Sequence, residues 1–449
     1  MQINYIEDYL INNKFEELLS EFNEKNIVDI AEEVEQLDIN LVIYLYKHMD
    51  KQYVGDLFSY LSLDTQNRIK DLLSSKEMSY LLDYVYTDDA VEFISQLPIT
   101  NIREILSYSD LNRRTQIYEL LGYPKDSAGS IMSKDYIEFG KYISVQDATQ
   151  VIKEHEGLSE FMDVYYITDR DGILEGITSV RDILFAPDLE IIENIMTTDV
   201  ISVNAYSDQE EAAKQFAKYD FSFLPVVDNT NKLVGLLSAD DIIDIVEDEA
   251  TEDIHMMGGI SWIKGSYLTT PARLIAFKRV GWLLILTVAY TLSSWIITGY
   301  DDLLTMIPSL LIFIPLLMDT AGDAGSQALA MVVRGIAVDK VDNTYYKEVL
   351  FKELGVSLIA GFFLFIGNFL RIMYFSINSG DAHLAFVVSL TVFFVVIISK
   401  IIGGLLPLVA LSFNQDPAVM ASPLITTISD SISLLIYFTI AAIVLGGRL

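Results

Sequence analysis

The stretch Ile314–Gly335, IPLLMDTAGDAGSQALAMVVRG, decides how the rest of the chain is understood. It begins inside an apolar run and then introduces two carboxylates, Asp319 and Asp323, and the amide of Gln327. Successive members of this set are four positions apart, so a helix places all three on one face. Acids are costly inside a bilayer, and those that occur there face a water-filled path or a partner. The stretch therefore predicts a polar pathway through a membrane.

Five apolar segments of spanning length make up the C-terminal part of the chain: roughly 280–298, 303–333, 354–376, 384–412 and 417–446. Each is long enough to cross about 30 Å of hydrocarbon. Basic residues precede the first segment and fill the loop between the second and third. The positive-inside rule then places the N-terminal part in the cytoplasm and, after five crossings, the C-terminus outside. We expect a multi-pass protein in the lipid bilayer of the cytoplasmic membrane.

The last apolar segment carries a third acid, Asp430. The hydroxyls of Thr426, Thr427 and Ser433 add oxygen ligands around it, and we expect Asp416-Pro417 to start this helix from its cytoplasmic end. Oxygen ligands without His or Cys suit hard cations, and magnesium, which keeps most of its waters, needs only one or two carboxylates. The alternative is a structural hydrogen bond or ion pair, but this segment contains no basic residue. A cation site is therefore favoured.

The acidic charge of the 449-residue chain lies before these segments. Residues 254–449 contain 11 basic and 11 acidic residues, so the whole net charge of −33 belongs to residues 1–253. Such a field repels nucleic acid and attracts cations, and no nucleic-acid partner is expected. A solubilising acidic surface would explain the same composition. Without cysteines, a histidine spacing for zinc or a nucleophile–base pair, an enzyme is not expected.

Residues 1–126 show short apolar runs at three- and four-residue spacing, separated by polar capping residues. This pattern predicts a superhelical stack of short helices. Asp88, Asp89 and Glu92 cluster at the start of one of them. At least one of these acids can simply complement the helix N-terminus, and the alternative is cation binding.

Residues 127–187 and 188–244 repeat one pattern. Each copy has an Ile-Met-Ser/Thr opener, an amphipathic helix, a β-rich run and a closing Gly-x-x-Ser-x-x-Asp motif, which predicts two tandem α/β modules. The closing motifs end in Ser179 and Asp182 and in Ser238 and Asp241. These side chains can hold ribose hydroxyls or cap the following helix. The repeat resembles a pair of CBS modules, which often bind adenosine nucleotides, so the resemblance implies a possible ATP site at these four residues.

Residues 245–270 are expected to form an acidic connecting helix. Glu249, Glu252 and Asp253 belong to its acidic run, and like charges at helical spacing repel one another. A divalent cation would turn this repulsion into attraction, whereas a solvated helix face is the plain alternative. Residues 271–449 are then the five-helix transmembrane pore domain. The predicted fold class is a multidomain α-helical membrane protein, with a cytosolic helical domain and a tandem α/β pair before five transmembrane helices.

The order of these parts resembles the MgtE family of bacterial magnesium channels, as do PLLMDTAGDAGSQ, ATEDI and DPAVMASPLITTISD. The resemblance implies a homodimer with the pore on the dyad, Mg²⁺ as both substrate and regulatory ligand, and a connecting helix that acts as a plug. By matching motif, it implies that Asp430 is the pore ligand and that Asp416 lies at the cytoplasmic mouth. It implies gating ligands on the plug helix, namely Glu249, Glu252 and Asp253. It also implies acids that bind ions between the helical domain and the CBS pair, namely Asp88, Asp89 and Glu92. Asp319, Asp323 and Gln327 then tune the vestibule. Asp323 replaces an Asn usual in the family.

The leading hypothesis is a homodimeric magnesium channel that cytosolic Mg²⁺ closes by binding between the helical domain, the CBS modules and the plug helix. The alternative is a secondary carrier that couples a divalent cation to sodium or protons through the same acids. A nucleotide-responsive membrane sensor without transport is a third class, and the acids at membrane depth speak against it.

Overall fold

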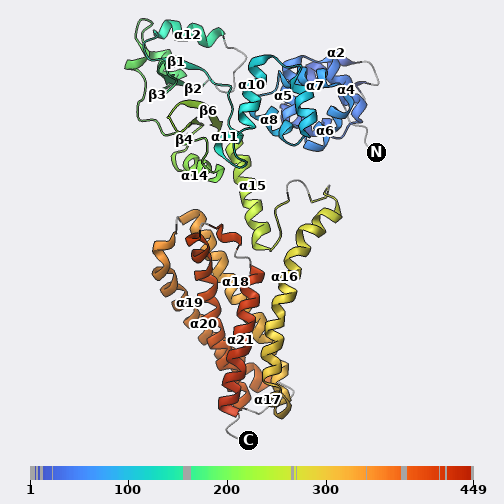
Figure 1. Ribbon diagram of the computed structural model, residues 1–449, viewed down its shortest axis with the longest axis vertical. Coiled ribbons are helices and arrows are strands. Elements are labelled where there is room, and N and C mark those ends of the chain that lie inside the picture. Colours follow the sequence, from blue (N-terminus) through green and yellow to red (C-terminus); the bar gives the residue numbers. More distant parts are fainter. Residues whose placement is uncertain are drawn as a thin grey trace. The chain divides into compact units, whose positions relative to one another are not determined.

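The computed structural model describes Ile6, 9–10, 14–22, 24–154, 163–263, 267–268, 270–339, 341–375, 382–413, 415–419 and 422–445. These residues form two compact units, Met1–Val246 and Glu247–Leu449, each considered by itself below. Figure 1 shows the order of the elements along the chain.

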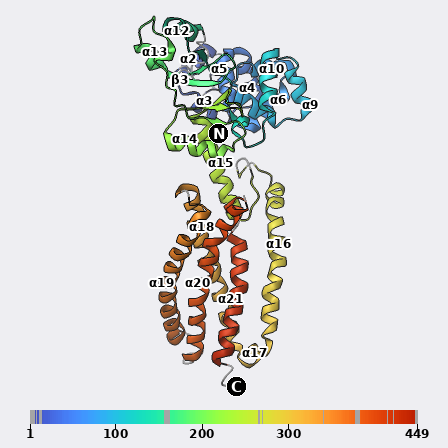
Figure 2. The same cartoon turned by 60° about the vertical axis from the view of Figure 1, so that its left-hand side comes forward.

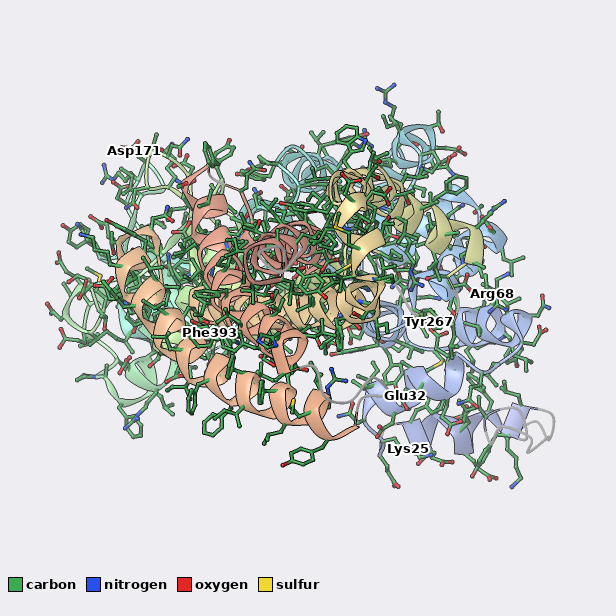
Figure 3. All side chains as sticks on the ribbon, turned by 90° about the horizontal axis from the view of Figure 1, so that it is seen from below. Lys25, Glu32, Arg68, Asp171, Tyr267 and Phe393 are labelled. Atoms are coloured by element: carbon green, nitrogen blue, oxygen red, sulfur yellow. The ribbon has the colours of Figure 1, made fainter. Side chains whose placement is uncertain are left out.

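Short helices make up the N-terminal part of the first unit, as the sequence predicts. They are α2 (Phe15–Phe22), α3 (Ile27–Val34), α4 (Ile39–His48), α5 (Lys51–Ser59), α6 (Leu63–Leu72), α7 (Ser75–Leu82), α8 (Thr87–Ser95), α9 (Ile99–Leu106) and α10 (Leu111–Leu120). Polar residues cap several N-termini, because a side-chain oxygen there accepts from an orphan backbone N–H. Their apolar sides share one core, while Lys25, Glu32 and Arg68 lie outside it (Figure 3).

Two α/β modules follow. The first contains α11 (Ala128–Ile131), β1 (Glu138–Gly140), α12 (Val145–Glu154), β2 (Val164–Thr168), β3 (Leu174–Ser179) and α13 (Val180–Phe185). The second contains η2 (Ile192–Asn194), β4 (Val203–Asn204), α14 (Gln209–Tyr219), β5 (Phe223–Val227) and β6 (Leu233–Ser238). In each sheet the first strand pairs parallel and the last strand antiparallel to the middle strand. The predicted tandem repeat is confirmed.

The opener of each module packs on the other module, which explains the glycine of the closing motif. Ser133 and Leu236 exchange backbone hydrogen bonds of 2.8 and 3.0 Å, and Ile177 and Thr197 do the same. A Cβ on Gly235 would lie 2.6 Å from the sulfur of Met132. On Gly176 it would lie 2.9 Å from the sulfur of Met196. Each opener methionine therefore fills the space that a side chain at the glycine would take.

The connecting helix α15 covers Ala239–Met257 and ends earlier than the 245–270 stretch suggested. Gly258 follows, and Gly259 takes a positive φ of 67°, which favours glycine and ends the helix. Residues 264–266 and 269 of the expected helix lie outside the described residues. The helix was predicted too long because the apolar character of its sequence continues past this turn.

The second unit is a bundle of long helices. They are α16 (Ala272–Gly299), α18 (Ile314–Asp339), α19 (Tyr346–Phe375), α20 (Ala382–Ser412) and α21 (Ser422–Leu445), and they run side by side (Figures 1 and 2). Among the described residues, four helices are long and apolar enough to cross a membrane, namely all of these except α18. The predicted fold class is confirmed, and the count of five spans stays a prediction.

The second predicted span, 303–333, is not one helix. It contains most of α17 (Asp301–Met306), the 3-10 helix η3 (Pro308–Phe313) and the larger part of α18. Pro308 lacks an N–H and begins η3, which separates the two α-helices. The α18 helix still belongs to the bundle, because its apolar face packs on α20 and α21.

Glycines allow α18 to approach its neighbours closely. A Cβ on Gly403 of α20 would lie 2.1 Å from the carbonyl oxygen of Gly325. A Cβ on Gly322 would lie 2.5 Å from the methyl group of Thr426 in α21. Small residues at such crossings let helix backbones meet, which is how helices associate where no water is displaced.

Candidate cation sites

The polar face of α18 is exposed on the single chain at its three polar residues. Asp319, Asp323 and Gln327 are exposed, whereas three alanines next to them in the helix are buried: Ala321, Ala324 and Ala328. We call the three exposed residues the polar stripe. Helical spacing therefore brings these three side chains to one face, as predicted.

Asp430 lies inside the chain, where it is 3% exposed. Its Oδ1 atom is buried and accepts no hydrogen bond from the described residues. The helices α18 and α21 run antiparallel, because α17 leads into α18 at the end of the bundle where α21 finishes (Figures 1 and 2). Asp319 is close enough to Asp430 for their charges to interact. The structure therefore joins one member of the polar stripe to the acid of the last helix.

The hydroxyls near Asp430 also bond to backbone. Thr427 Oγ1 donates to the carbonyl oxygen of Pro423 at 2.9 Å, and Ser433 Oγ donates to that of Asp430 at 2.7 Å. Such bonds use the hydroxyl hydrogen and leave oxygen lone pairs as acceptors. Thr426 turns its methyl group toward Gly322. Ser429, a neighbour of Asp430, has a buried hydroxyl with no hydrogen bond among the described residues.

Asp416 does not begin α21. It is exposed, and Oδ1 accepts from the backbone N–H of Ala418 at 2.8 Å. It thus caps the short 3-10 helix η5 (Pro417–Val419), whereas α21 begins at Ser422. The expectation that Asp416-Pro417 starts the last long helix is wrong in this respect.

The bundle also holds a buried base, Lys400 of α20, which is 6% exposed. Its Nζ donates to Gln327 Oε1 at 3.2 Å. The sequence marks Lys400 as unusual in an apolar segment but names no partner for it. The structure supplies one from the polar stripe.

A second group of acids lies in the first unit, where α8, residues 133–135 and the start of α15 meet. We call Asp88, Asp135 and Asp241 the junction acids. Ser133 Oγ lies 3.3 Å from both Asp88 Oδ1 and Asp135 Oδ2. Asp135 Oδ2 also accepts from the N–H and the hydroxyl of Thr87, at 2.7 Å each.

The junction acids share a negative environment. Burial, followed by the charges of Asp241, Asp89 and Asp135, raises the pKa of Asp88 well above its usual value. Burial also raises the pKa of Asp241 to about 7, with a further contribution from Asp240. Carboxyl groups with raised pKa values are ready to exchange a proton for a cation. Asp89 is partly buried beside them, and Glu92 is exposed one turn further along α8.

The two closing motifs cap helices. Ser179 Oγ accepts from the backbone N–H of Asp182, and the Asp182 carboxylate accepts from Ser179. Ser238 and Asp241 make the same reciprocal contacts. The capping interpretation is thus seen in both copies. An open cavity of about 600 Å³ adjoins the first motif, with Arg181, Asp182, Phe185 and Pro187 in its lining.

The acids of α15 lie near the bundle end of that helix. Glu249, Glu252 and Asp253 are partly buried, at spacings of three and four that share a helix face. Met257, at the end of α15, packs against Leu329 and Val333 of α18 and Ile425 of α21.

Among the described residues, no group of three or more acidic or histidine side chains has the geometry of a closed metal site. Sequence reasoning missed Asp135 and Lys400 as members of these sites. The signal for Asp135 was its place two positions after an opener that repeats in both modules. The contacts of Lys400 depend on a helix crossing that the sequence pattern does not give.

Comparisons with known proteins agree with this organisation. Residues 314–440 match the family profile described as "Divalent cation transporter" (MgtE), and residues 25–126 match the "MgtE intracellular N domain". Residues 128–188 and 192–248 each match the CBS domain. The "Magnesium transporter MgtE" of Bacillus subtilis is 30% identical over 92% of this chain and 94% of that protein. The chain belongs to the MgtE family.

Two further likenesses concern the same family. The "Magnesium transporter MgtE" of Thermus thermophilus is 30% identical over 80% of this chain and 78% of that protein. A solved structure described as the soluble part of a magnesium transporter aligns with a TM-score of 0.52 at 28% identity. It covers 55% of this chain and 97% of that one. As an MgtE family member, the chain is a transporter with a CBS pair before its apolar helices.

Proposed function

We propose that this chain forms a homodimeric channel that carries Mg²⁺ into the cell across the cytoplasmic membrane. The observation that supports it best is Asp430, a carboxylate inside the helix bundle whose Oδ1 accepts no hydrogen bond from the described residues. A buried polar atom without a partner is costly, and a cation or its hydration water would satisfy it. Its neighbour Asp319 offers the second carboxylate.

The dimer is proposed from the polar stripe. Asp319, Asp323 and Gln327 are exposed on the single chain at a depth where lipid would otherwise surround them. Carboxylates that face hydrocarbon are unfavourable, so we expect water and a second chain to separate the stripe from lipid. Two copies related by a dyad would face their stripes and supply four carboxylates to one hydrated path. We propose the cytoplasm for the N-terminal unit and the outside for the C-terminus.

Closure by Mg²⁺ is proposed from the soluble acids. The junction acids and the α15 acids Glu249, Glu252 and Asp253 repel one another without a cation. Mg²⁺ bound between the helical domain, the CBS modules and α15 would remove that repulsion and favour one packed state, a shift driven by differential binding. The packing of Met257 on α18 and α21 gives α15 a direct contact with the bundle through which to act.

The CBS pair adds a proposed adenosine-nucleotide site at the first module. The cavity beside Asp182 has Arg181 for a phosphate and Phe185 for a base, a combination that suits a nucleotide. The ribose would compete with Ser179 for the Asp182 carboxylate. Titration of the full chain with ATP, with Arg181→Ala as the variant, tests this site. Unchanged heat of binding in that variant would place ATP elsewhere.

The main test measures Mg²⁺ entry into liposomes that contain the purified chain, together with single-channel currents in a planar bilayer. Unitary currents carried by Mg²⁺, independent of sodium and pH gradients, are expected. Flux that requires such a gradient and shows no unitary current would favour the carrier. Full-length protein should close as Mg²⁺ rises on the cytosolic side, whereas a chain without residues 1–253 should stay open. A truncated protein that still closes at millimolar Mg²⁺ would contradict the gating scheme.

A further inference from the structure

Lys400 is a buried ammonium in a pathway proposed for cations. It lies within α20, the most apolar of the candidate spans, and is 6% exposed. Taking a charge out of water costs several kcal/mol per ion, and ionisable residues inside a membrane are accordingly rare and functional. Among the described residues its one hydrogen bond is to Gln327 Oε1 at 3.2 Å, and it makes no direct ion pair.

The opposite charge nearby is on α19, which packs against α20 one turn beyond Lys400. Glu353 of α19 is 9% exposed, and its Cγ lies 2.9 Å from the place of a Cβ on Gly404. Gly404 is one turn beyond Lys400, and Glu353 is close enough to Lys400 for their charges to interact. The two charges compensate each other in part, without neutralising each other by direct contact.

The crossing of α18 and α20 fixes Lys400 beside the polar stripe. The carbonyl oxygen of Ser399 lies 3.3 Å from the place of a Cβ on Gly325, and Gly403 meets the Gly325 backbone directly. Lys400 lies between these two contact points in sequence. Its ammonium is therefore held next to the helix that carries Asp319 and Asp323.

The bond to Gln327 also orients the amide of that residue. Its carbonyl oxygen accepts from Lys400, so the NH₂ group is what Gln327 offers to the exposed face. An NH₂ group donates hydrogen bonds and does not coordinate a cation. The polar stripe thus contains two carboxylates that attract cations, Asp319 and Asp323. The next residue, Gln327, offers a hydrogen-bond donor and has the Lys400 ammonium beside it.

We infer that Lys400 sets the affinity of the Mg²⁺ pathway, because its fixed positive charge weakens cation binding at the polar stripe enough for the ion to leave. Conduction needs a site that attracts the ion but does not retain it. The Coulomb energy between a carboxylate and a divalent ion is twice that for a monovalent ion at the same distance, so carboxylates without a positive charge nearby would bind Mg²⁺ for long. This inference rests on the proposed Mg²⁺ transport.

The test is a charge series in the full-length chain reconstituted in liposomes, read as the Mg²⁺ concentration for half-maximal flux and the maximal flux. Lys400→Met removes the charge at similar length, and both quantities should fall, the first by about tenfold. Glu353→Gln should raise the half-maximal concentration, and the double variant should return toward wild type. Lys400→Arg keeps the charge and serves as the control. Gln327→Leu removes the hydrogen bond alone and should shift half-saturation less than Lys400→Met.

The sign of these shifts separates the inference from a structural role, because loss of packing lowers maximal flux without tightening half-saturation. An unchanged or raised half-maximal concentration in Lys400→Met overturns the inference while Mg²⁺ transport stands. If Lys400→Met does not fold, Glu353→Gln decides: a lowered or unchanged half-maximal concentration there overturns it too. Wild-type liposomes without Mg²⁺ flux would instead reject the proposed function.

Discussion

The helix bundle and the junction acids both present aspartate carboxyl groups, but in opposite settings. In the bundle, Asp430 lies in an apolar helix near Asp319, and its buried Oδ1 accepts no hydrogen bond from the described residues. At the junction, Asp88, Asp135 and Asp241 stand in a strongly acidic unit and are close to one another because three chain segments meet there. We expect a site with few carboxylates to bind an ion weakly enough to pass it on, and a site with many carboxylates to retain and sense it.

The largest expected effect is that of replacing Asp430. Asp430→Ala should reduce Mg²⁺ flux at least about a hundredfold, because losing one partner of a buried charged site costs about 3–5 kcal/mol and each 1.4 kcal/mol is tenfold. Flux into liposomes measures it, and chemical crosslinking checks that dimers persist. Asp301→Ala, an exposed acid of α17, is the control. Flux like that of the wild type from Asp430→Ala would remove this residue from the pathway.

The next effect concerns the junction acids, and the matching residue of the first module serves as the control. Asp241→Asn should shift the Mg²⁺ concentration that closes the transporter upward by about tenfold, since one ligand charge is lost. Asp182→Asn changes the matching position of the first module, which has no Asp88 beside it, and should leave closure unchanged. Cytosolic-side Mg²⁺ titration of the currents measures both. Equal shifts in the two variants would show that capping, not cation binding, explains the motif.

A third prediction concerns the crossing that brings the stripe and Lys400 together. Gly403→Ala places a Cβ 2.1 Å from the Gly325 carbonyl oxygen, so the helices must separate, at a cost of about 1–3 kcal/mol. Gly367→Ala in α19 meets open space and should be neutral or slightly stabilising, by up to about 1 kcal/mol. Thermal unfolding in detergent compares the two. Equal unfolding temperatures would mean that the crossing is looser than described.

The smallest expected effect is a pH dependence of the free energy of unfolding that comes from the junction acids. The folded pKa of Asp241 is about 7, above its usual value, so the native state holds this proton more tightly than the unfolded chain. Its contribution to stability is fully present below the unfolded pKa of about 4 and is lost as pH rises through 7. Without Mg²⁺, about 1 kcal/mol should be lost between pH 6 and pH 8.

Thermal unfolding of the full chain at the two pH values measures this loss. Asp241→Asn should flatten the dependence, and saturating Mg²⁺ should reduce it. Stability that rises with pH across this window would contradict the raised pKa.

Local patterns could be predicted from the sequence in both regions, whereas helix ends could not. The four-residue spacing predicted the polar stripe, and the repeated Gly-x-x-Ser-x-x-Asp motif predicted two modules, because both depend on local geometry alone. Helix ends were less predictable: η3 interrupts the second predicted span, and α15 stops at Gly258-Gly259 although apolar residues continue. A window average of hydropathy does not register a single turn.

The sequence by itself determined which residues carry charge at membrane depth and which segments repeat, because composition and periodicity are properties of neighbours along the chain. Only the tertiary structure decided which of them meet. Asp241 reaches Asp88 from more than a hundred residues away, and Lys400 reaches Gln327 across a glycine crossing. Such pairings follow from the packing of whole elements, whose backbones approach only where side chains are small enough.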